Sequence, residues 1–335
     1  MTIYANSLSM KRLECMLPAA LSITLGMAGA ARAAEVPVIE KPVLFDTPEA
    51  DRIVTAMQIF PPDNPWNEDV SDWPVHPDSA RILATMEPNR SLGYNLDMGF
   101  VLVPADQPKA PVRITAYPEE SDPGPFPIPD NAPIEGWPLG YPDRGPTTLE
   151  QVQRAGKGDR HVIVVDPSAM KLYELFAAYR TDAGWDAAQA SVFDLTSNAL
   201  RPDGWTSADA AGLPIFPAAV RYSDVAGGVV RHAMRFTARK TRRAYVNPAT
   251  HFASRHTDMN LPRMGERFRL RRDFDTTGFS PHARAILEGL KKHGMFVADN
   301  GVNWLISITP DGRIEGLEDL RKVKGRDFEI VTPAP

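Results

Sequence analysis

The stretch His161-Val162-Ile163-Val164-Val165-Asp166 decides the fold class of this chain. Its four consecutive β-branched residues favour an extended strand. The following Asp166-Pro167-Ser168 supplies residues that preset a bend. A second stretch rich in aromatic and aliphatic residues, 170–179, comes soon after this bend. The sequence therefore predicts two successive strands separated by a short turn.

Strand patterns dominate the rest of the chain as well. Eight further segments share this composition, namely 100–103, 112–117, 191–195, 229–237, 266–274, 295–298, 303–308 and 328–331. Strands this numerous, with short turns and no regular alternation with helices, are typical of antiparallel sandwiches and jelly rolls. We therefore predict a mainly β fold, an antiparallel, jelly-roll-like β-sandwich in a single domain with one or two short helices.

The clearest helical pattern covers residues 280–292. Ser280 suits the N-cap position, Pro281 suits the first helical position, and Gly294 suits the end of the helix. A second short helix is predicted over residues 78–85.

The first 33 residues have the pattern of a secretory signal peptide. Lys11 and Arg12 precede an uncharged run over residues 17–31, and the small-residue site Ala31-Arg32-Ala33 follows it. The run has about 15 residues, fewer than the roughly 20 that span a bilayer. We predict cleavage before Ala34, and a periplasmic or secreted protein without a membrane span.

The mature chain is expected to have two parts, an N-terminal arm over residues 34–97 with a short helix and a β-sandwich domain over residues 98–335. Within the domain, residues 118–146 are rich in proline, which removes amide donors and prevents a helix or a central strand. This segment is predicted to connect elements at the surface. Alternatively, Phe126, Trp137 and Tyr141 lie along the rim of a groove.

Charge and cysteine content exclude several function classes. The chain has 37 Lys and Arg against 42 Asp and Glu, a net charge of −5, and loss of residues 1–33 removes three basic residues and one acidic residue. This negative balance disfavours nucleic acid as a partner, because phosphate binding requires a basic surface. The single cysteine, Cys15, lies in the predicted signal peptide, so the mature chain has no disulfide.

Three titratable residues are predicted on the apolar faces of strands. Alternation places His161 with Ile163 and Val165, Glu174 with Leu172 and Phe176, and His232 with Met234 and Phe236. A buried imidazole or carboxylate requires a partner or a ligand. Each of the three is either a paired core residue or part of a site. If they meet at one pocket, Glu174 and His232 are the leading acid and base, with His161 beside them.

Other residues complete this predicted site for glycan cleavage. Asp194 and Asp209 are candidates for a second carboxylate, which glycoside hydrolysis requires, and Asp209 alternatively caps a helix. For substrate binding we select aromatic and basic residues near these positions, namely Trp205, Arg221, Tyr222 and Trp304. An arginine and a tyrosine next to His232 also suit β-elimination on a uronic-acid polymer.

We therefore predict an exported enzyme that cleaves a polysaccharide by hydrolysis or β-elimination, without a cofactor. Walker, His-Glu-x-x-His and Gly-x-Ser-x-Gly motifs are absent from the sequence. One alternative is a non-catalytic protein that binds carbohydrate or another envelope polymer. A further alternative is a metal-dependent enzyme with a divalent ion on His161, His232 and His251.

Several blocks of the sequence resemble a widespread group of exported bacterial proteins. These blocks are 159–166 (DRHVIVVD), 172–179 (LYELFAAY), the loop 197–214, 231–237 (RHAMRFT) and 295–301 (MFVADNG). The likeness covers most of residues 59–331. It implies export and a single folded unit, and it transfers no catalytic residue.

Overall fold

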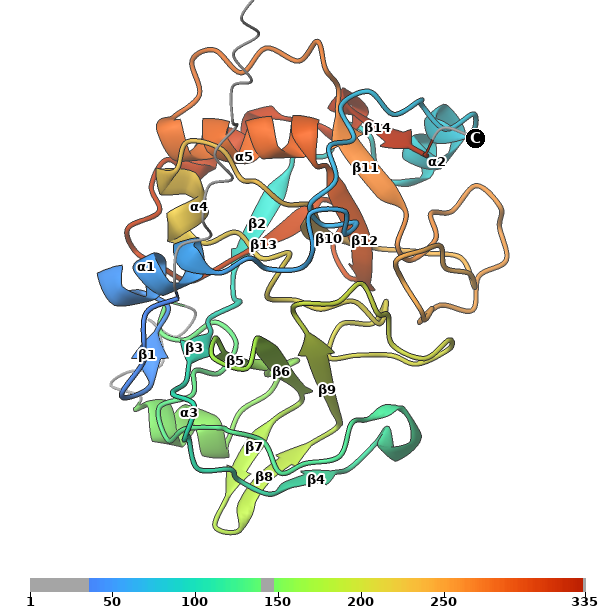
Figure 1. The fold of residues 1–335 in the computed structure, drawn as a ribbon. Helices are drawn as coiled ribbons and strands as arrows, with labels where there is room; N and C mark the ends of the chain where they lie inside the picture. Colours follow the sequence, from blue (N-terminus) through green and yellow to red (C-terminus); the bar gives the residue numbers. More distant parts are fainter. Residues whose placement is uncertain (1–35, 140–147, 334–335) are drawn as a thin grey trace, which may run out of the picture. The chain divides into compact units, whose positions relative to one another are not determined.

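Strand β5 (Val162–Asp166) is the middle strand of a five-stranded sheet in the computed structural model, which describes residues 36–139 and 148–333 (Figure 1). The sheet has the order β1-β3-β5-β6-β9. Its other strands are β1 (Val43–Leu44), β3 (Val101–Leu102), β6 (Lys171–Phe176) and β9 (Gln189–Asp194). Asp166 forms the predicted turn by accepting hydrogen bonds from Ser168 and Ala169.

Both faces of β5 are buried, which explains its unbroken apolar sequence. Ile163 and Val165 belong to the larger hydrophobic core, which also contains residues of the six-stranded sheet. Val162 and Val164 point the other way and belong to a smaller core. The alternation predicted from the sequence is thus present, with apolar packing on each side.

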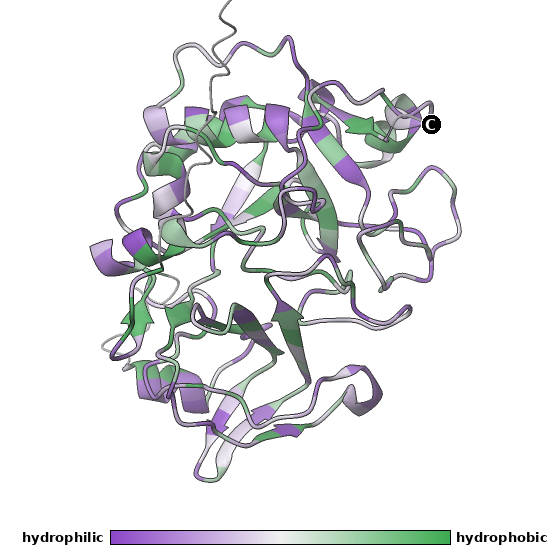
Figure 2. Ribbon diagram, in the orientation of Figure 1, coloured by the Kyte–Doolittle hydropathy of each residue, from purple (hydrophilic) through white to green (hydrophobic). Residues whose placement is uncertain are grey.

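The six-stranded sheet has the order β14-β11-β12-β10-β13-β2. Its strands are β2 (Gly93–Leu96), β10 (Met234–Ala238), β11 (Arg267–Leu270), β12 (Met295–Asn300), β13 (Leu305–Ile308) and β14 (Phe328–Val331). Helix α5 (Pro281–Lys292) precedes β12 and packs against β11. Its hydrophobic and hydrophilic residues alternate along its length (Figure 2), and the apolar ones, such as Ile286 and Leu290, enter the larger core.

The smaller core lies between the five-stranded sheet and a third sheet of order β4-β8-β7. The strands of this third sheet are β4 (Val112–Ile114), β7 (Tyr179–Thr181) and β8 (Gly184–Ala187). Part of the proline-rich segment fills the smaller core, since Phe126, Ile128 and Ile134 are buried there and Trp137 packs against it. The prediction of a surface connector is therefore wrong for these residues. Tyr141 lies outside the described residues.

Short helices complete the described part of the chain. Helix α2 (Ser79–Thr85) and helix α5 agree with the two predicted from the sequence. Three others were not predicted, namely α1 (Pro48–Ala56), α3 (Leu149–Arg154) and α4 (Tyr222–Ala226). The predicted N-terminal arm contributes strands to both larger sheets, because β1 pairs with β3 and β2 pairs with β13.

The fold is mixed α/β, with 14 strands in three sheets among the described residues. The strand pairs β10·β12, β13·β2, β3·β5 and β4·β8 are parallel. The prediction of purely antiparallel pairing is therefore wrong, because the long connections between these strands allow parallel neighbours. Within residues 36–139 and 148–333, no helix has the length and apolar character needed to cross a membrane.

Trp304, predicted to bind substrate, lies entirely inside the larger core. Its indole has no exposed surface and stacks between Phe236 and Phe328, with ring centroids 5.7 and 5.3 Å away. The indole Nε1 donates a hydrogen bond to the carbonyl oxygen of Met86 at 2.6 Å. Trp304 therefore offers no surface on which a sugar can stack.

This placement predicts that Trp304→Ala costs about 3–5 kcal/mol of unfolding free energy, the usual range for a buried aromatic residue replaced by alanine. Urea denaturation measures the change. Trp205→Ala is the matched control, because Trp205 is only partly buried, and it should cost about 1 kcal/mol or less. Equal losses in the two variants would contradict the assignment of Trp304 to the core.

Candidate functional site

Glu174 of β6 holds a buried loop by hydrogen bonds to its backbone. The side chain has no exposed surface, and its carboxylate accepts hydrogen bonds from Ile215 N at 2.9 Å and Phe216 N at 2.8 Å. Burial raises the pKa of Glu174 to about 7 even though these amides lower it. The contacts of Glu174 thus fix the loop backbone against the five-stranded sheet.

His161, just before β5, binds the same loop at a different point. Its Nε2 lies 2.9 Å from the carbonyl oxygen of Ala208, and its Nδ1 lies 3.0 Å from Oε2 of Glu135. Both neighbours are acceptors, so the ring donates from both nitrogens as an imidazolium. Burial lowers the pKa of His161, but the carboxylate of Glu135 outweighs it and raises the pKa to about 9.

Arg235 of β10 and Asp209 of the loop form a bidentate ion pair. Arg235 Nε and Nη2 donate to the two carboxylate oxygens of Asp209 at 2.7 and 2.8 Å, and Arg235 Nη1 donates to Ser307. Asp209 has no exposed surface. Asp209 therefore neutralises a buried guanidinium, and it does not cap a helix.

Asp97 and Glu135 line one surface pocket of about 500 Å³, whose wall contains Asp159 as a third acidic residue. Asp97 directly follows β2, and its carbonyl oxygen accepts a hydrogen bond from Gly136 N at 2.8 Å, which holds the two segments together. The Asp97 side chain is 8% exposed, and its Oδ1 is buried without a hydrogen-bond partner among the described residues. The pocket wall also includes Tyr94, Asn95, Leu96, Leu139, Lys157, Gly158, Asp159 and Arg160.

The surroundings separate the pKa values of these two carboxylates. Burial raises the pKa of Asp97 to about 7; the charge of Arg235 opposes this and the charge of Glu135 adds to it. Burial also raises the pKa of Glu135, but attraction to His161 and hydrogen bonds from it dominate and lower the pKa to about 2. Below about pH 7 the pocket therefore contains one carboxyl, Asp97, that is mostly protonated and another, Glu135, that is ionised.

His232 lies apart from His161 and Glu174. It lines a pocket together with Arg221, whereas His161 and Glu174 line neither this pocket nor the pocket of Asp97 and Glu135. His232 also precedes strand β10 instead of lying within it. Its Nε2 is 3.2 Å from Oδ2 of Asp224 and its Nδ1 is 3.0 Å from the carbonyl oxygen of Ala233. The predicted meeting of all three residues at one pocket is therefore wrong, because His161 and Glu174 bind the buried loop whereas His232 binds Asp224 of helix α4.

The side chains of Asp194 and Tyr222 both interact with other residues of the protein. Asp194 accepts hydrogen bonds from Lys171 Nζ at 2.9 Å and from the Thr196 hydroxyl at 2.6 Å. The Thr196 hydrogen bond, followed by that of Lys171, lowers the pKa of Asp194 to about 2. The Tyr222 ring packs against the guanidinium of Arg313, whose Cζ is 4.0 Å from the ring centroid. Asp194 ends a strand, and Tyr222 packs beside helix α1.

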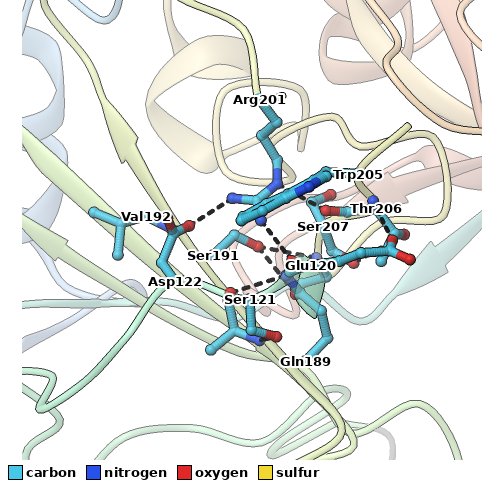
Figure 3. A network of polar contacts seen from close by, with 12 residues as sticks. Glu120, Ser121, Asp122, Gln189, Ser191, Val192, Arg201, Trp205, Thr206 and Ser207 are labelled. Atoms are coloured by element: carbon cyan, nitrogen blue, oxygen red, sulfur yellow. Dashed lines mark hydrogen bonds and ion pairs between the residues drawn. The ribbon is translucent and has the colours of Figure 1, made fainter. Parts of the chain in front are cut away.

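Trp205 packs on Arg201 in a polar network between the loop and the proline-rich segment (Figure 3). Arg201 Cζ lies 5.5 Å from the Trp205 ring centroid, and Arg201 Nη1 donates to Asp122 Oδ2 at 2.6 Å. The Thr206 amide donates to Glu120 at 2.8 Å. One face of the Trp205 indole thus stabilises the loop.

The three histidines predicted as an alternative metal site also have different partners. His251 Nδ1 lies 2.7 Å from the carbonyl oxygen of Ala210, and its ring stacks on Phe252. In the described ranges, no three His, Cys, Asp or Glu side chains are grouped so that they could hold a metal ion. His161, His232 and His251 each have different partners.

Sequence reasoning did not select Asp97 or Glu135. Neither belongs to a recognised motif, and both lie outside the predicted strands. The strand that positions Asp97, Gly93–Leu96, was itself not predicted, so the sequence pattern gave no indication of Asp97. Glu135 becomes identifiable only through His161, which is 26 residues away in the chain.

Comparisons of the chain with protein-family models, with curated proteins and with solved structures find no match. A functional proposal therefore depends on the geometry and electrostatics of the two pockets.

The buried carboxyl of Glu174 predicts a specific pH dependence of stability. Its pKa is raised from 4.5 to about 7, so between these values the folded state retains a proton that the unfolded state releases. Its contribution to stability is present below pH 4.5 and is lost as the pH rises through 7. In Glu174→Gln this loss, on the order of 3 kcal/mol, should disappear from the pH profile.

Urea denaturation of both proteins from pH 4 to pH 8 measures this difference in slope. Glu318→Gln serves as the control, because Glu318 is exposed and its removal should leave the profile unchanged. A wild-type stability that rises relative to Glu174→Gln over this range would show that Glu174 is ionised in the folded protein.

Proposed function

We propose that this protein is an exported enzyme that cleaves glycosidic bonds in a polysaccharide, with Asp97 and Glu135 as its catalytic carboxyl groups. The observation that carries the proposal is the shared pocket, whose wall contains both Asp97 and Glu135. The Oδ1 of Asp97 is buried behind this wall without a hydrogen-bond partner among the described residues. Glycoside hydrolysis requires two carboxyl groups, of which one donates a proton and the other is ionised.

In this mechanism Asp97 is the general acid. It donates its proton to the oxygen of the departing sugar, which leaves as an alcohol. Glu135 faces the anomeric carbon as the ionised carboxylate, and either activates a water molecule or attacks that carbon itself. His161 is a positioning residue, because its Nδ1–H binds Oε2 of Glu135 and its charge keeps that carboxylate ionised.

This assignment replaces Glu174 and His232 as the leading acid and base. Glu174 has no exposed surface and faces backbone amides, so a substrate in the pocket does not reach it. A second route for this pocket is β-elimination on a uronic-acid polymer. Hydrolysis and elimination give different products, so one assay separates them.

Two further parts of the proposal concern export and architecture. We infer that residues 1–33 direct export and are removed.

We also infer that the five- and six-stranded sheets are the two layers of a sandwich, with some parallel pairs. This is supported by the larger core, which contains Ile163 and Leu172 from one sheet and Phe236 and Phe268 from the other.

The catalytic assignment predicts that Asp97→Asn and Glu135→Gln each lower kcat by about 100-fold or more on the polysaccharide that the wild type cleaves. Each substitution removes one of the two groups that transfer a proton or stabilise charge. The measurement is a panel of polysaccharides assayed for reducing ends and for unsaturated products. Wild-type activity should also fall above about pH 7, where Asp97 loses its proton, and Asp97→Asn should lack this limb.

Asp194→Asn is the matched control, because Asp194 is paired with Lys171 away from the pocket, and it should retain activity. Folding of each variant is verified by its thermal unfolding midpoint. Folded Asp97→Asn or Glu135→Gln with wild-type kcat would refute the assignment. Wild-type binding without turnover of any bound polymer would instead favour the non-catalytic alternative.

The export proposal predicts a mature protein that begins at Ala34. Expression of the full chain in a bacterial host, followed by fractionation and mass measurement, determines the N-terminus and the compartment. An Ala31→Arg variant should impair processing, because the cleavage site requires small residues. Full-length protein retained inside the cell in the wild type would contradict export.

A further inference from the structure

A second pocket, of about 340 Å³, lies between the α1 region and the segment around helix α4. We call it the α1–α4 pocket. One part of its wall is apolar and includes Val54, Met57 and Ile59, and the other part is polar and includes Arg231 and His232. Its volume is within the range of small-molecule sites. The site proposed for glycosidic cleavage shares no lining residue with it.

Three basic side chains and one acidic side chain line the α1–α4 pocket. Asp224 Oδ2 accepts hydrogen bonds from the Arg221 amide at 2.9 Å, and the same oxygen lies 3.2 Å from His232 Nε2. Arg221 Nη1 donates to the carbonyl oxygen of Phe216 at 2.6 Å. Asp224 is therefore already shared by Arg221 and His232, and the lining residues retain an excess of positive charge.

Hydrogen-bond donors are also in excess at this pocket. Arg231 is exposed, and no ion pair or hydrogen bond from its guanidinium is found within residues 36–139 and 148–333. Trp66 is 2% exposed, and its Nε1 is buried without an acceptor among the described residues. Arg221 Nε lies 3.1 Å from Oδ2 of Asp224 in an ion pair without an aligned hydrogen bond. A ligand that carries acceptor oxygens would match this arrangement.

We propose that the α1–α4 pocket binds an organic carboxylate with an apolar body. The carboxylate pairs with the guanidinium of Arg231, whose planar fork suits two parallel hydrogen bonds. The apolar body packs against Val54, Met57 and Ile59. This proposal is independent of the glycosidic activity, because it rests on a different pocket.

A hydrolytic role for this pocket is not supported, although Ser223 lines it beside Asp224 and His232. A serine nucleophile requires a histidine nitrogen that is free to accept its proton. Both His232 nitrogens already face acceptors, the Ala233 carbonyl and Asp224. His232 is therefore not placed to take a proton from Ser223. The polar side of the pocket suits binding of an anion.

Isothermal titration calorimetry with benzoate tests the proposal on the mature protein. Benzoate carries one carboxylate on an apolar ring, and benzyl alcohol is its neutral counterpart. We expect saturable benzoate binding to the wild type and at least tenfold weaker binding of benzyl alcohol. Arg231→Gln should weaken benzoate binding about tenfold, because it removes a charge-assisted pair. Arg231→Lys should give an intermediate affinity.

Arg255→Gln is the matched control. Arg255 is exposed, lies outside the pocket and carries the same charge, so its loss should leave benzoate binding unchanged. Because Arg231 is exposed, its replacement should preserve the fold, and the thermal unfolding midpoint verifies this. Absence of benzoate binding, equal binding of benzyl alcohol, or equal weakening in the Arg231→Gln and Arg255→Gln variants would each overturn the proposal.

Discussion

Burial of an irregular loop between sheets is the constraint on which the rest of the structure depends. Residues around Ala208 and Ile215 have almost no exposed surface, yet they form no sheet ladder. Their backbone groups still require partners, because each unpaired buried group costs about 1–3 kcal/mol. Strand side chains supply these partners, since Glu174 binds Ile215 N, His161 faces the Ala208 carbonyl, and Ser191 binds Ala208 N. This requirement explains why titratable residues occur on apolar strand faces.

The same constraint concentrates charge inside the molecule. His161 as an imidazolium requires a counter-charge, which Glu135 supplies, and Arg235 requires the bidentate partner Asp209. Arg235, Asp209 and His161 are buried in these pairs, whereas Glu135 is partly exposed in the pocket wall. Asp97 differs, because it shares their electrostatic field but has an oxygen without a hydrogen-bond partner in the described part of the chain. A structural role accounts for the paired residues and leaves Asp97 unexplained.

Local patterns in the sequence predicted most strands and the helix at 281–292, and they placed His161 and Glu174 on core-facing sides. The patterns could not predict what these side chains contact, because the loop atoms that they bind are 47 and 41 residues away in the chain. Parallel pairing was missed for the same reason. Helix α1 was missed although the sequence does contain its capping pattern. Thr47 accepts a hydrogen bond from Ala50 N, and Pro48 occupies the first turn.

Exposure and hydrogen bonding together distinguish Glu135 from the other titratable residues of the interior. His161 and Glu174 were selected from the sequence because buried charge is costly. Both bind backbone atoms of the buried loop, and His161 is also paired with Glu135, so their positions have a structural explanation. Glu135 combines the two situations, because it binds His161 on one side and lines an open pocket on the other. A group that is held rigidly by the core and also faces solvent is preorganised for chemistry. That dual position, more than burial itself, distinguishes the pocket at Asp97 and Glu135 from the rest of the charged interior.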